Sequence, residues 1–387
     1  MNFALTEEQQ AIVHATREFV TRELVPHERE VEDSGVLREE LRGELKAKAI
    51  TAGLYAANMP AEVGGAGLDG VSWVLYEKEL GRTSYILHTA CVSRPSNILL
   101  ACEGAQRERY LLPAVRGERT ECLAMSEPQA GSDLRGMRTT ATVSGGDFII
   151  NGTKHFISHA DHSDFVILFA ASGEEDSARG KRKLITAFLV DMGTPGFEVL
   201  RGYRNVSHRG YTNSILQFSD CRVPKSAVLG EVHRGFEVAN TWLGATRLQV
   251  AANCLGRAER AFELAKQWAV ERRQFGQQIG KFQGVSFKLA DMAVELRAAE
   301  LLTLEAAWKL EQKSATDMDM AIAKLKATET LAMVADEALQ IHGGMGLMTE
   351  LPLERIWRDA RIERIWDGTS EVQRHIISRA LLRPLGG

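Results

Sequence analysis

The stretch Ile362-Glu-Arg-Ile-Trp-Asp-Gly-Thr-Ser-Glu-Val-Gln-Arg374, near the end of the chain, carries the most information about its fold. A carboxylate residue, Asp367, stands directly before Gly368 and Thr369. Taken alone, this residue is an ordinary loop aspartate, because glycine at the next position is typical of turns. Its meaning depends on motifs elsewhere in the chain.

The size and charge of the chain exclude several classes of protein. Its 387 residues are too many for one hydrophobic core, so two or three packed units are expected. The net charge of −4 argues against a nucleic-acid-binding surface. The N-terminal residues lack the basic start and apolar core of a signal peptide, and no run reaches the ~18 apolar residues of a membrane span. The five cysteines have neither metal-ligand nor redox spacing, so we expect reduced thiols in a cytoplasmic protein.

The hydrophobic pattern changes twice along the chain. Apolar residues recur at helical spacing after Thr6, which is a typical helix N-cap. From Thr139 to Phe236, short apolar runs alternate with turns and predict an antiparallel β domain. Long segments rich in Ala, Leu, Glu and Lys then predict a helical bundle: 251–271, 285–312 and 316–342. We therefore expect an α+β fold with an N-terminal α-helical domain (1–120), a middle β domain (121–232) and a C-terminal α-helical bundle (233–387).

Two motifs lie at the start of the predicted β domain. Met125-Ser-Glu-Pro-Gln-Ala-Gly-Ser-Asp133 combines small residues, which let backbone approach a ligand, with the hydroxyls of Ser126 and Ser132. A purely structural turn explains it equally well. Lys154-His-Phe-Ile-Ser158 follows the turn Asn151-Gly152, and Phe156 there fits ordinary β-sheet packing. The nearby histidines and aspartates have no ligand spacing and favour a polar loop over a metal site: residues 155, 159, 161, 162 and 164.

Two further motifs follow predicted helices. Arg272-Arg-Gln-Phe-Gly276 stands where a helix ends, a position that favours arginine. Gln340-Ile-His-Gly-Gly-Met-Gly346 is glycine-rich, and the simplest interpretation is a helix C-cap. It is not a Rossmann fingerprint, because a helix precedes it and not a strand.

Together, and in this order, these motifs resemble those of the acyl-CoA dehydrogenases, FAD enzymes that desaturate acyl thioesters. The opening stretch is similar to the C-terminal signature of that family, and residues 125–133 are similar to its first signature. The resemblance covers essentially the whole chain. It implies a helix–β–helix fold with a barrel-like middle domain, a homotetramer built as a dimer of dimers, and electron-transfer flavoprotein as electron acceptor. The implied reaction converts an acyl-CoA to the trans-2-enoyl-CoA, with flavin N5 accepting the β-hydride.

The resemblance also implies roles for individual residues. Those expected near the flavin are Met125, Ser126, Phe156, Ser158 and Thr369. Those expected to reach the FAD of a neighbouring subunit are Arg272, Phe275, Gln283, Gln340, Gly343 and Gly344. Arginine suits a diphosphate because it donates two parallel hydrogen bonds. Those expected near the substrate are Ser132, Arg247 and Gly368.

The base is where this sequence departs from the family. Much of the family has glutamate before Gly-Thr to remove the α-proton, whereas this chain has Asp367. Aspartate reaches about 1.5 Å less far, and a misplacement of ~1 Å can cost about 100-fold in rate. Three alternatives follow from the shorter side chain. The loop and the substrate lie closer together than in the family, a different residue is the base, or the enzyme catalyses a different reaction. Some members carry the base in the segment matching Leu243 to Arg247, but no carboxylate lies there, so we expect Asp367 to be the catalytic base.

Two other segments bear on the substrate. In the family a helix matching about Ser84 to Asn97 lines the acyl pocket, and here it carries His88, Thr89, Ser93 and Arg94. A bonded polar group could select a functionalised, short or branched acyl chain, although we expect Arg94 to face solvent. The charged segment Ser172 to Lys183 is expected to be an exposed loop. A role for its residues 179 and 181–183 in holding CoA phosphates is the alternative.

Two other functions stay open. Nitroalkane oxidase belongs to this superfamily and uses an aspartate base, so a flavin oxidase acting on a substrate without CoA is one alternative. A flavin- or CoA-binding protein without turnover is the other. No nucleic acid, membrane or metal is expected in any of these functions.

Overall fold

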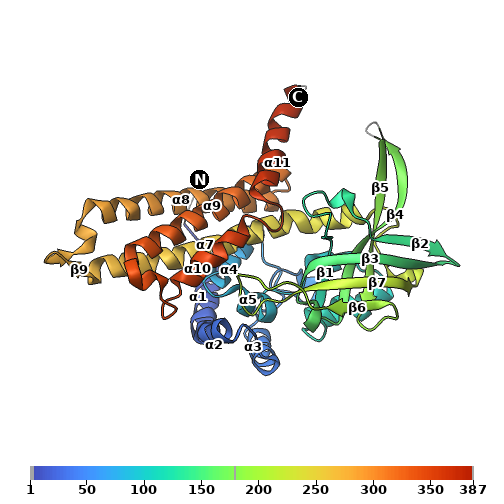
Figure 1. Ribbon diagram of the computed structural model, residues 1–387, viewed down its shortest axis with the longest axis horizontal. Coiled ribbons are helices and arrows are strands. Elements are labelled where there is room, and N and C mark those ends of the chain that lie inside the picture. The colour runs from blue at the N-terminus through green and yellow to red at the C-terminus, as the bar shows by residue number, and fades with distance from the viewer. Residues whose placement is uncertain (1–3, 178–179, 386–387) are drawn as a thin grey trace.

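The computed structural model describes residues 4–177 and 180–385, and its N-terminal part is helical (Figure 1). Thr6 caps the first helix in a reciprocal capping box with Gln9. The α-helices are α1 (Glu7–Phe19), α2 (Glu28–Ser34), α3 (Glu39–Thr51), α4 (Gly70–Leu80), α5 (Tyr85–Cys91) and α6 (Leu112–Val115). Helix α5 is shorter than the predicted helix over Ser84 to Asn97. Pro95 has no N–H and disfavours helical backbone at the residue before it, so the helix stops and a 3-10 turn follows at Asn97–Ala101.

The middle of the chain is a single curled sheet. Its strands are β1 (Glu121–Ala124), β2 (Thr140–Ser144), β3 (Asp147–Ser158), β4 (Phe165–Ser177), β5 (Gly180–Asp191), β6 (Phe197–Leu200), β7 (Asn213–Val223) and β8 (Val228–Leu229). They lie in the order β6-β7-β3-β2-β4-β5-β8, with β1 paired to β4. Most pairings are antiparallel as predicted, but β1 and the first residue of β2 pair in parallel with β4.

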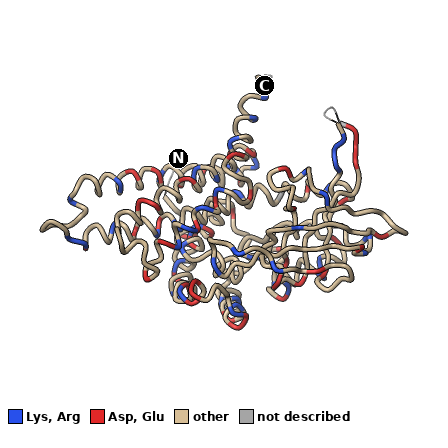
Figure 2. Tube along the Cα trace, viewed as in Figure 1, with Lys and Arg blue, Asp and Glu red and all other residues tan. Residues whose placement is uncertain are grey.

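The charged segment Ser172 to Lys183 is not a loop, contrary to the prediction. It forms the outer part of the β4–β5 hairpin, in which Glu175 stands opposite Arg182 and pairs with it at 2.5 Å, and Glu174 pairs diagonally with Lys181 at 3.5 Å. Opposite charges across two strands stabilise such an arm, and Figure 2 shows acidic residues on one strand and basic residues on the other. Lys181 and Arg182 are therefore already paired with acidic side chains, Lys183 donates to the carbonyl of Met137 at 2.6 Å, and Arg179 lies outside the described residues.

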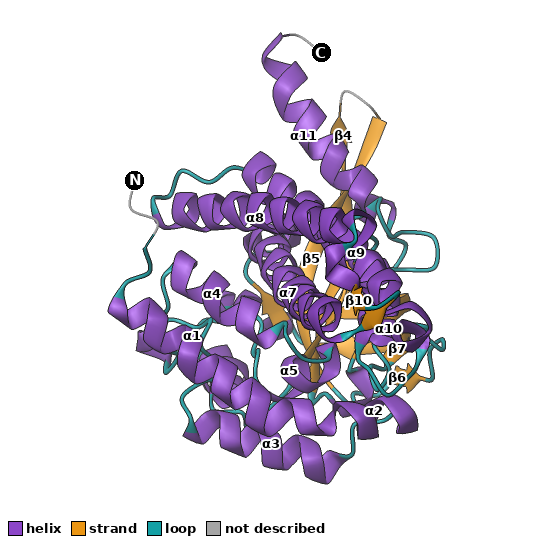
Figure 3. Cartoon of the chain, turned by 90° about the vertical axis from the view of Figure 1, so that its left-hand side faces the viewer, coloured by secondary structure: helices purple, strands orange, loops and turns teal. Residues whose placement is uncertain are grey.

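The C-terminal part is a bundle of long helices. They are α7 (Gly235–Glu271), α8 (Gln283–Glu311), α9 (Asp317–His342), α10 (Leu353–Glu363) and α11 (Ser370–Leu382), with a short β9–β10 ribbon (Arg273–Gln274, Gln277–Gln278) between α7 and α8. Buried alanines such as Ala258 and Ala327 let α7 and α9 pack closely. Figures 1 and 3 both show α11 and the β4–β5 hairpin projecting from the same side of the molecule.

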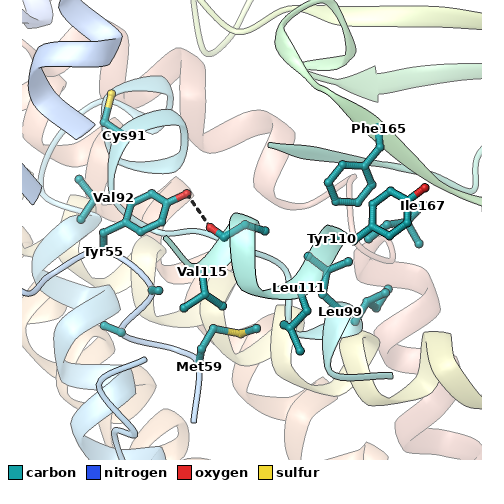
Figure 4. Packing of buried hydrophobic residues seen from close by; sticks show 14 of the residues in the cluster. Tyr55, Met59, Cys91, Val92, Leu99, Tyr110, Leu111, Val115, Phe165 and Ile167 are labelled. Atoms are coloured by element: carbon teal, nitrogen blue, oxygen red, sulfur yellow. Dashed lines mark hydrogen bonds between the residues drawn. The ribbon is translucent and has the colours of Figure 1, made fainter. Parts of the chain in front are cut away.

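One hydrophobic core joins the N-terminal helices to the sheet. Tyr110 packs on Phe165 of β4 with ring centroids 4.8 Å apart, and Leu111 and Ile167 lie beside them (Figure 4). The hydroxyl of Tyr55 donates to the carbonyl of Ala114 at 3.4 Å. The sheet is therefore anchored on the helical domain, and this fixes the position of the cavity between them.

Candidate active site

A cavity of about 1300 Å³ lies where the three parts of the chain meet. Its lining comes from α5 and the segment after it, from β1 and β3, from α7, and from the loop between α10 and α11. Many of the residues singled out from the sequence line this one cavity: Met125, Ser126, Ser132, Phe156, Ser158, Arg247, Asp367, Gly368 and Thr369.

The loop that carries Asp367 has a constrained backbone. Asp367 has φ 50° and Gly368 has φ 93°, so both lie in the left-handed region that favours glycine. Thr369 ends the turn by capping α11, where its side chain accepts the N–H of Val372 at 3.2 Å. The sequence Asp-Gly-Thr thus turns the chain sharply and places the carboxylate on the cavity wall.

Lys324 of α9 fixes the loop that carries Asp367, and the sequence did not predict this role. Its ammonium is buried and donates to the carbonyl oxygens of Trp366 and Gly368, on either side of Asp367. Gln373 also donates to the Gly368 carbonyl, at 2.9 Å. A lysine inside a helix gives no sequence signal of such a role, because only the fold brings it beneath a loop more than forty residues later.

Burial raises the pKa of the Asp367 carboxyl, and the neighbouring Glu363 raises it further. The positive charges of Lys324 and Arg247 act in the opposite direction. Arg247 is itself paired with Asp317 at 3.0 Å. A carboxylate with a raised pKa is a stronger base when ionised, which suits proton abstraction.

A buried charged cluster supports Trp366, the residue before Asp367. The indole N–H of Trp366 donates to Glu363 at 2.8 Å, and Glu363 also pairs with Arg257 at 2.7 Å and His208 at 3.1 Å. Although desolvation opposes ionisation, Arg257 and His208 hold the pKa of Glu363 at about 2. The His208 ring stacks on Trp366 with centroids 5.1 Å apart. His208 therefore packs against the loop that carries Asp367 and also pairs with Glu363 behind it.

The opposite wall is built by β3 and the loop after β1. Lys154 and Glu127 are both buried and pair at 2.8 Å, and Lys154 also donates to the carbonyl of Met125 at 3.0 Å. The N–H of His155 donates to the Ser126 carbonyl at 3.0 Å. Both residues of the ion pair stand inside the motifs quoted above. The pair therefore locks the Met125-Ser126 turn onto β3.

This wall has the chemistry of a site for a flat ring. Phe156 has φ 56° and leaves 54% of its surface exposed although it lines the cavity, so a large apolar face is open to a ligand there. The hydroxyl of Ser158 hydrogen-bonds the hydroxyl of Tyr211, and Ser126 also lines the cavity. An apolar face bordered by hydroxyls fits the isoalloxazine ring of a flavin.

The other six residues expected near a cofactor are not among the described residues that line this cavity. They gather where α7 ends and α8 begins, beside the end of α9: Arg272, Phe275, Gln283, Gln340, Gly343 and Gly344. The stacking of Trp268 on His342, with centroids 4.9 Å apart, joins these two helix ends. In Figure 1 the β9–β10 ribbon between α7 and α8 lies at the end of the molecule opposite to the sheet. Phe275 there is 94% exposed.

Arg94 does not face solvent, so that expectation was wrong. Only 14% of its side chain is exposed, it lines the cavity, and it pairs with Glu121 of β1 at 2.8 Å. The chain turns at Pro95 and carries Arg94 inward against the sheet.

Two kinds of feature are absent from the part of the chain that the structure describes. The residues 4–177 and 180–385 hold no group of three or more His, Cys, Asp or Glu side chains placed to bind a metal ion. None of the helices in the same ranges is long and apolar enough to cross a membrane.

Comparison with known proteins gives the class to which this fold and cavity belong. Family models of the acyl-CoA dehydrogenase N-terminal, middle and C-terminal domains match residues 6–118, 122–221 and 233–382. The human mitochondrial short-chain specific acyl-CoA dehydrogenase is 36% identical over 384 residues, covering 98% of this chain and 91% of that protein.

Two solved structures are similar along the whole chain. One, from work on the electron transferring flavoprotein of Acidaminococcus fermentans, has a TM-score of 0.90 and 34% identity, covering 99% of this chain and 100% of that one. The FAD complex of PigA has a TM-score of 0.91 and 27% identity, covering all of both chains. The chain therefore belongs to the acyl-CoA dehydrogenase family. It is an oxidoreductase, and its cofactor is FAD.

Proposed function

We propose that this enzyme converts an acyl-CoA thioester to its trans-2-enoyl-CoA, with Asp367 as the base that removes the α-proton. One observation carries the proposal. Asp367 lies on the cavity wall with a raised pKa, in the same cavity as the Met125, Ser126, Phe156 and Ser158 wall. A base and a flavin site that share one cavity match the needs of α,β-dehydrogenation.

The flavin-side residues are proposed to hold FAD in two groups. Met125, Ser126, Phe156, Ser158 and Thr369 border the cavity and fit the ring. The remote group is proposed to bind the FAD of a neighbouring subunit: Arg272, Phe275, Gln283, Gln340, Gly343 and Gly344. This requires at least a dimer, and we propose the homotetramer typical of the family. When bound, FAD supplies the acceptor for the β-hydride.

The protein residues supply the proton chemistry. The Asp367 carboxylate accepts the α-proton, and its desolvation raises its basicity. Lys324 holds the peptide groups that flank it, so the carboxylate does not have to be positioned anew in each turnover. Gly368 is proposed to offer its backbone N–H to the thioester carbonyl, while Ser132 and Arg247 border the substrate.

We propose electron-transfer flavoprotein as the electron acceptor. The support is the similar structure solved in work on such a flavoprotein. Reduced enzyme would then be reoxidised rapidly by electron-transfer flavoprotein and slowly by oxygen, whereas a nitroalkane oxidase would show the reverse order.

The decisive experiment is an anaerobic titration of the flavin absorbance band with acyl-CoAs. We expect bleaching by wild-type enzyme, and a decrease in the bleaching rate of about 10²–10⁴-fold in Asp367→Asn, the scale of a lost general base. Asp367→Glu keeps a carboxylate and should bleach. Bleaching of Asp367→Asn at the wild-type rate would remove Asp367 from the mechanism. Bleaching by nitroalkanes and by no thioester would favour the oxidase.

A further inference from the structure

Part of the cavity wall is polar and is not used by the proton or flavin chemistry. It consists of Ser93 and Arg94 after α5, Gln249 of α7, and Glu121 of β1. These four residues, defined here as the polar wall, line the same cavity as Asp367. Tyr85 of α5 lines this cavity as well. Ser93, Arg94 and Gln249 come from the helical parts of the chain, whereas Phe156 stands on β3.

A carboxylate stands behind this wall without a cationic partner in its hydrogen-bond network. Glu77 of α4 is fully buried, and its side chain accepts hydrogen bonds from Ser93 at 2.6 Å, Gln249 at 2.9 Å and Asn253 at 3.0 Å. Burial raises the pKa of Glu77. The amide nitrogen of Gln249 also donates to Ser93 at 2.8 Å. The network fixes both side chains, and none of these bonds uses the amide carbonyl oxygen of Gln249.

The charge of the wall decides which polar groups it can accept. Arg94 is its one positive side chain among the four, and Glu121 neutralises it at 2.8 Å while also accepting the N–H of Ser96 at 2.8 Å. A substrate carboxylate would have to share this guanidinium with Glu121 and approach Glu77 as well. Two carboxylates on one cation in a low-dielectric site repel each other. An acyl chain ending in a carboxylate is therefore a poor occupant.

A plain hydrocarbon chain is also a poor occupant. It would cover the Gln249 carbonyl and the Arg94–Glu121 pair without replacing the hydrogen bonds that water makes to them. A buried polar group left without a partner costs about 1–3 kcal/mol. A group that both donates and accepts, such as a hydroxyl or a carboxamide, can bond a carbonyl or carboxylate oxygen and a guanidinium together.

We propose that the polar wall selects acyl-CoAs whose chain carries a neutral hydrogen-bonding group, a hydroxyl or carboxamide, beyond the β-carbon. This inference rests on the proposed dehydrogenation. The group stands beyond the β-carbon because that carbon must lose a hydride. Gln249 and Ser93 recognise the group. Arg94 does not attract a substrate anion, because its charge is already neutralised by Glu121.

The test compares thioesters of matched shape. Glutaramoyl-CoA, glutaryl-CoA and 5-methylhexanoyl-CoA have the same outline and end in a carboxamide, a carboxylate and two methyl groups. A second pair, 6-hydroxyhexanoyl-CoA and heptanoyl-CoA, tests a hydroxyl. We expect kcat/KM for a neutral polar member to exceed that of its hydrocarbon match by about 10-fold, the scale of one to two hydrogen bonds. Glutaryl-CoA should be the poorest of its set.

Variants locate the effect. Gln249→Leu and Ser93→Ala should each lower the ratio of polar to hydrocarbon kcat/KM towards unity. Thr89→Val is the matched control. Thr89 also lines the cavity, but its hydroxyl already donates to the Tyr85 carbonyl at 2.7 Å, so the ratio should not change.

The outcomes separate this inference from the proposed function. If the hydrocarbon members exceed both neutral polar members in wild-type enzyme, or if Gln249→Leu and Ser93→Ala leave the ratio unchanged, the polar wall does not select the substrate, although dehydrogenation stands. If glutaryl-CoA is the best substrate, the wall binds an anion and the charge argument is wrong. If no thioester bleaches the flavin anaerobically, the proposed function itself fails.

Discussion

At the scale of single residues, Lys324 connects the bundle to the proposed base. Its charge lowers the pKa of Asp367, and its two hydrogen bonds to backbone carbonyls fix the loop. The ionised carboxylate is the active form of the base, so kcat/KM should rise with pH through the pKa of Asp367 in the free enzyme. Removing the positive charge of Lys324 destabilises the ionised carboxylate of Asp367 and therefore raises its pKa.

We therefore expect Lys324→Met to shift the acidic limb of the kcat/KM profile to higher pH and to lower the plateau rate. The control is Lys326→Met, two residues away on the same helix, whose ammonium pairs with Glu295. Its profile should match that of wild type. A profile of Lys324→Met that falls in amplitude without moving along the pH axis would leave Lys324 a structural role only.

At the scale of elements, the Lys154–Glu127 pair joins β3 to the loop that follows β1. Desolvation lowers the pKa of Lys154 to about 8 despite the attraction of Glu127. Removing one partner of such a buried pair leaves an uncompensated charge, whereas removing both does not.

We expect Lys154→Met to destabilise the protein by about 3–5 kcal/mol and to weaken FAD retention. The double variant Lys154→Met/Glu127→Gln should recover most of the stability. Thermal unfolding followed by circular dichroism and by flavin release would measure both effects. Equal losses in the single and double variants would show that the pair does not act as a unit.

The sequence predicted the elements better than their ends and connections. Periodicity located the long helices and the principal strands, because apolar faces must be buried in any packing. It failed at Ser172 to Lys183, since charges that cancel across a hairpin look like loop charges along one strand. The end of α5 was also missed, because Pro95 stops the helix inside a segment that the resemblance predicted to be helical throughout. Lys324 and His208 were not found because a buried polar residue acquires its partners only from the fold.

At the scale of the whole molecule, the two groups of proposed FAD residues lie in different places. One group borders the cavity, and the other stands at the end of the bundle with Phe275 almost fully exposed. A site shared between subunits makes cofactor affinity depend on assembly.

We expect Arg272→Ala to lose FAD on gel filtration at low protein concentration and to regain it when FAD and protein are raised together. Arg273→Ala, an exposed neighbour in β9, is the matched control and should retain FAD. Flavin content and molar mass measured on the same eluting peak would test this. Full retention of FAD by Arg272→Ala at every concentration would contradict a shared site.

The left-handed backbone at Asp367 also has an evolutionary consequence. Aspartate is enriched at positive φ because its short side chain can bond locally, whereas glutamate gains no such relief. In a lineage with aspartate at this position, the side chain is shorter, but the backbone of the turn that carries the carboxylate is less strained. Exchange between the two acids over evolutionary time would then require accompanying changes in the turn and in Lys324 beneath it, more than in the acyl pocket. Related sequences should show these positions changing together.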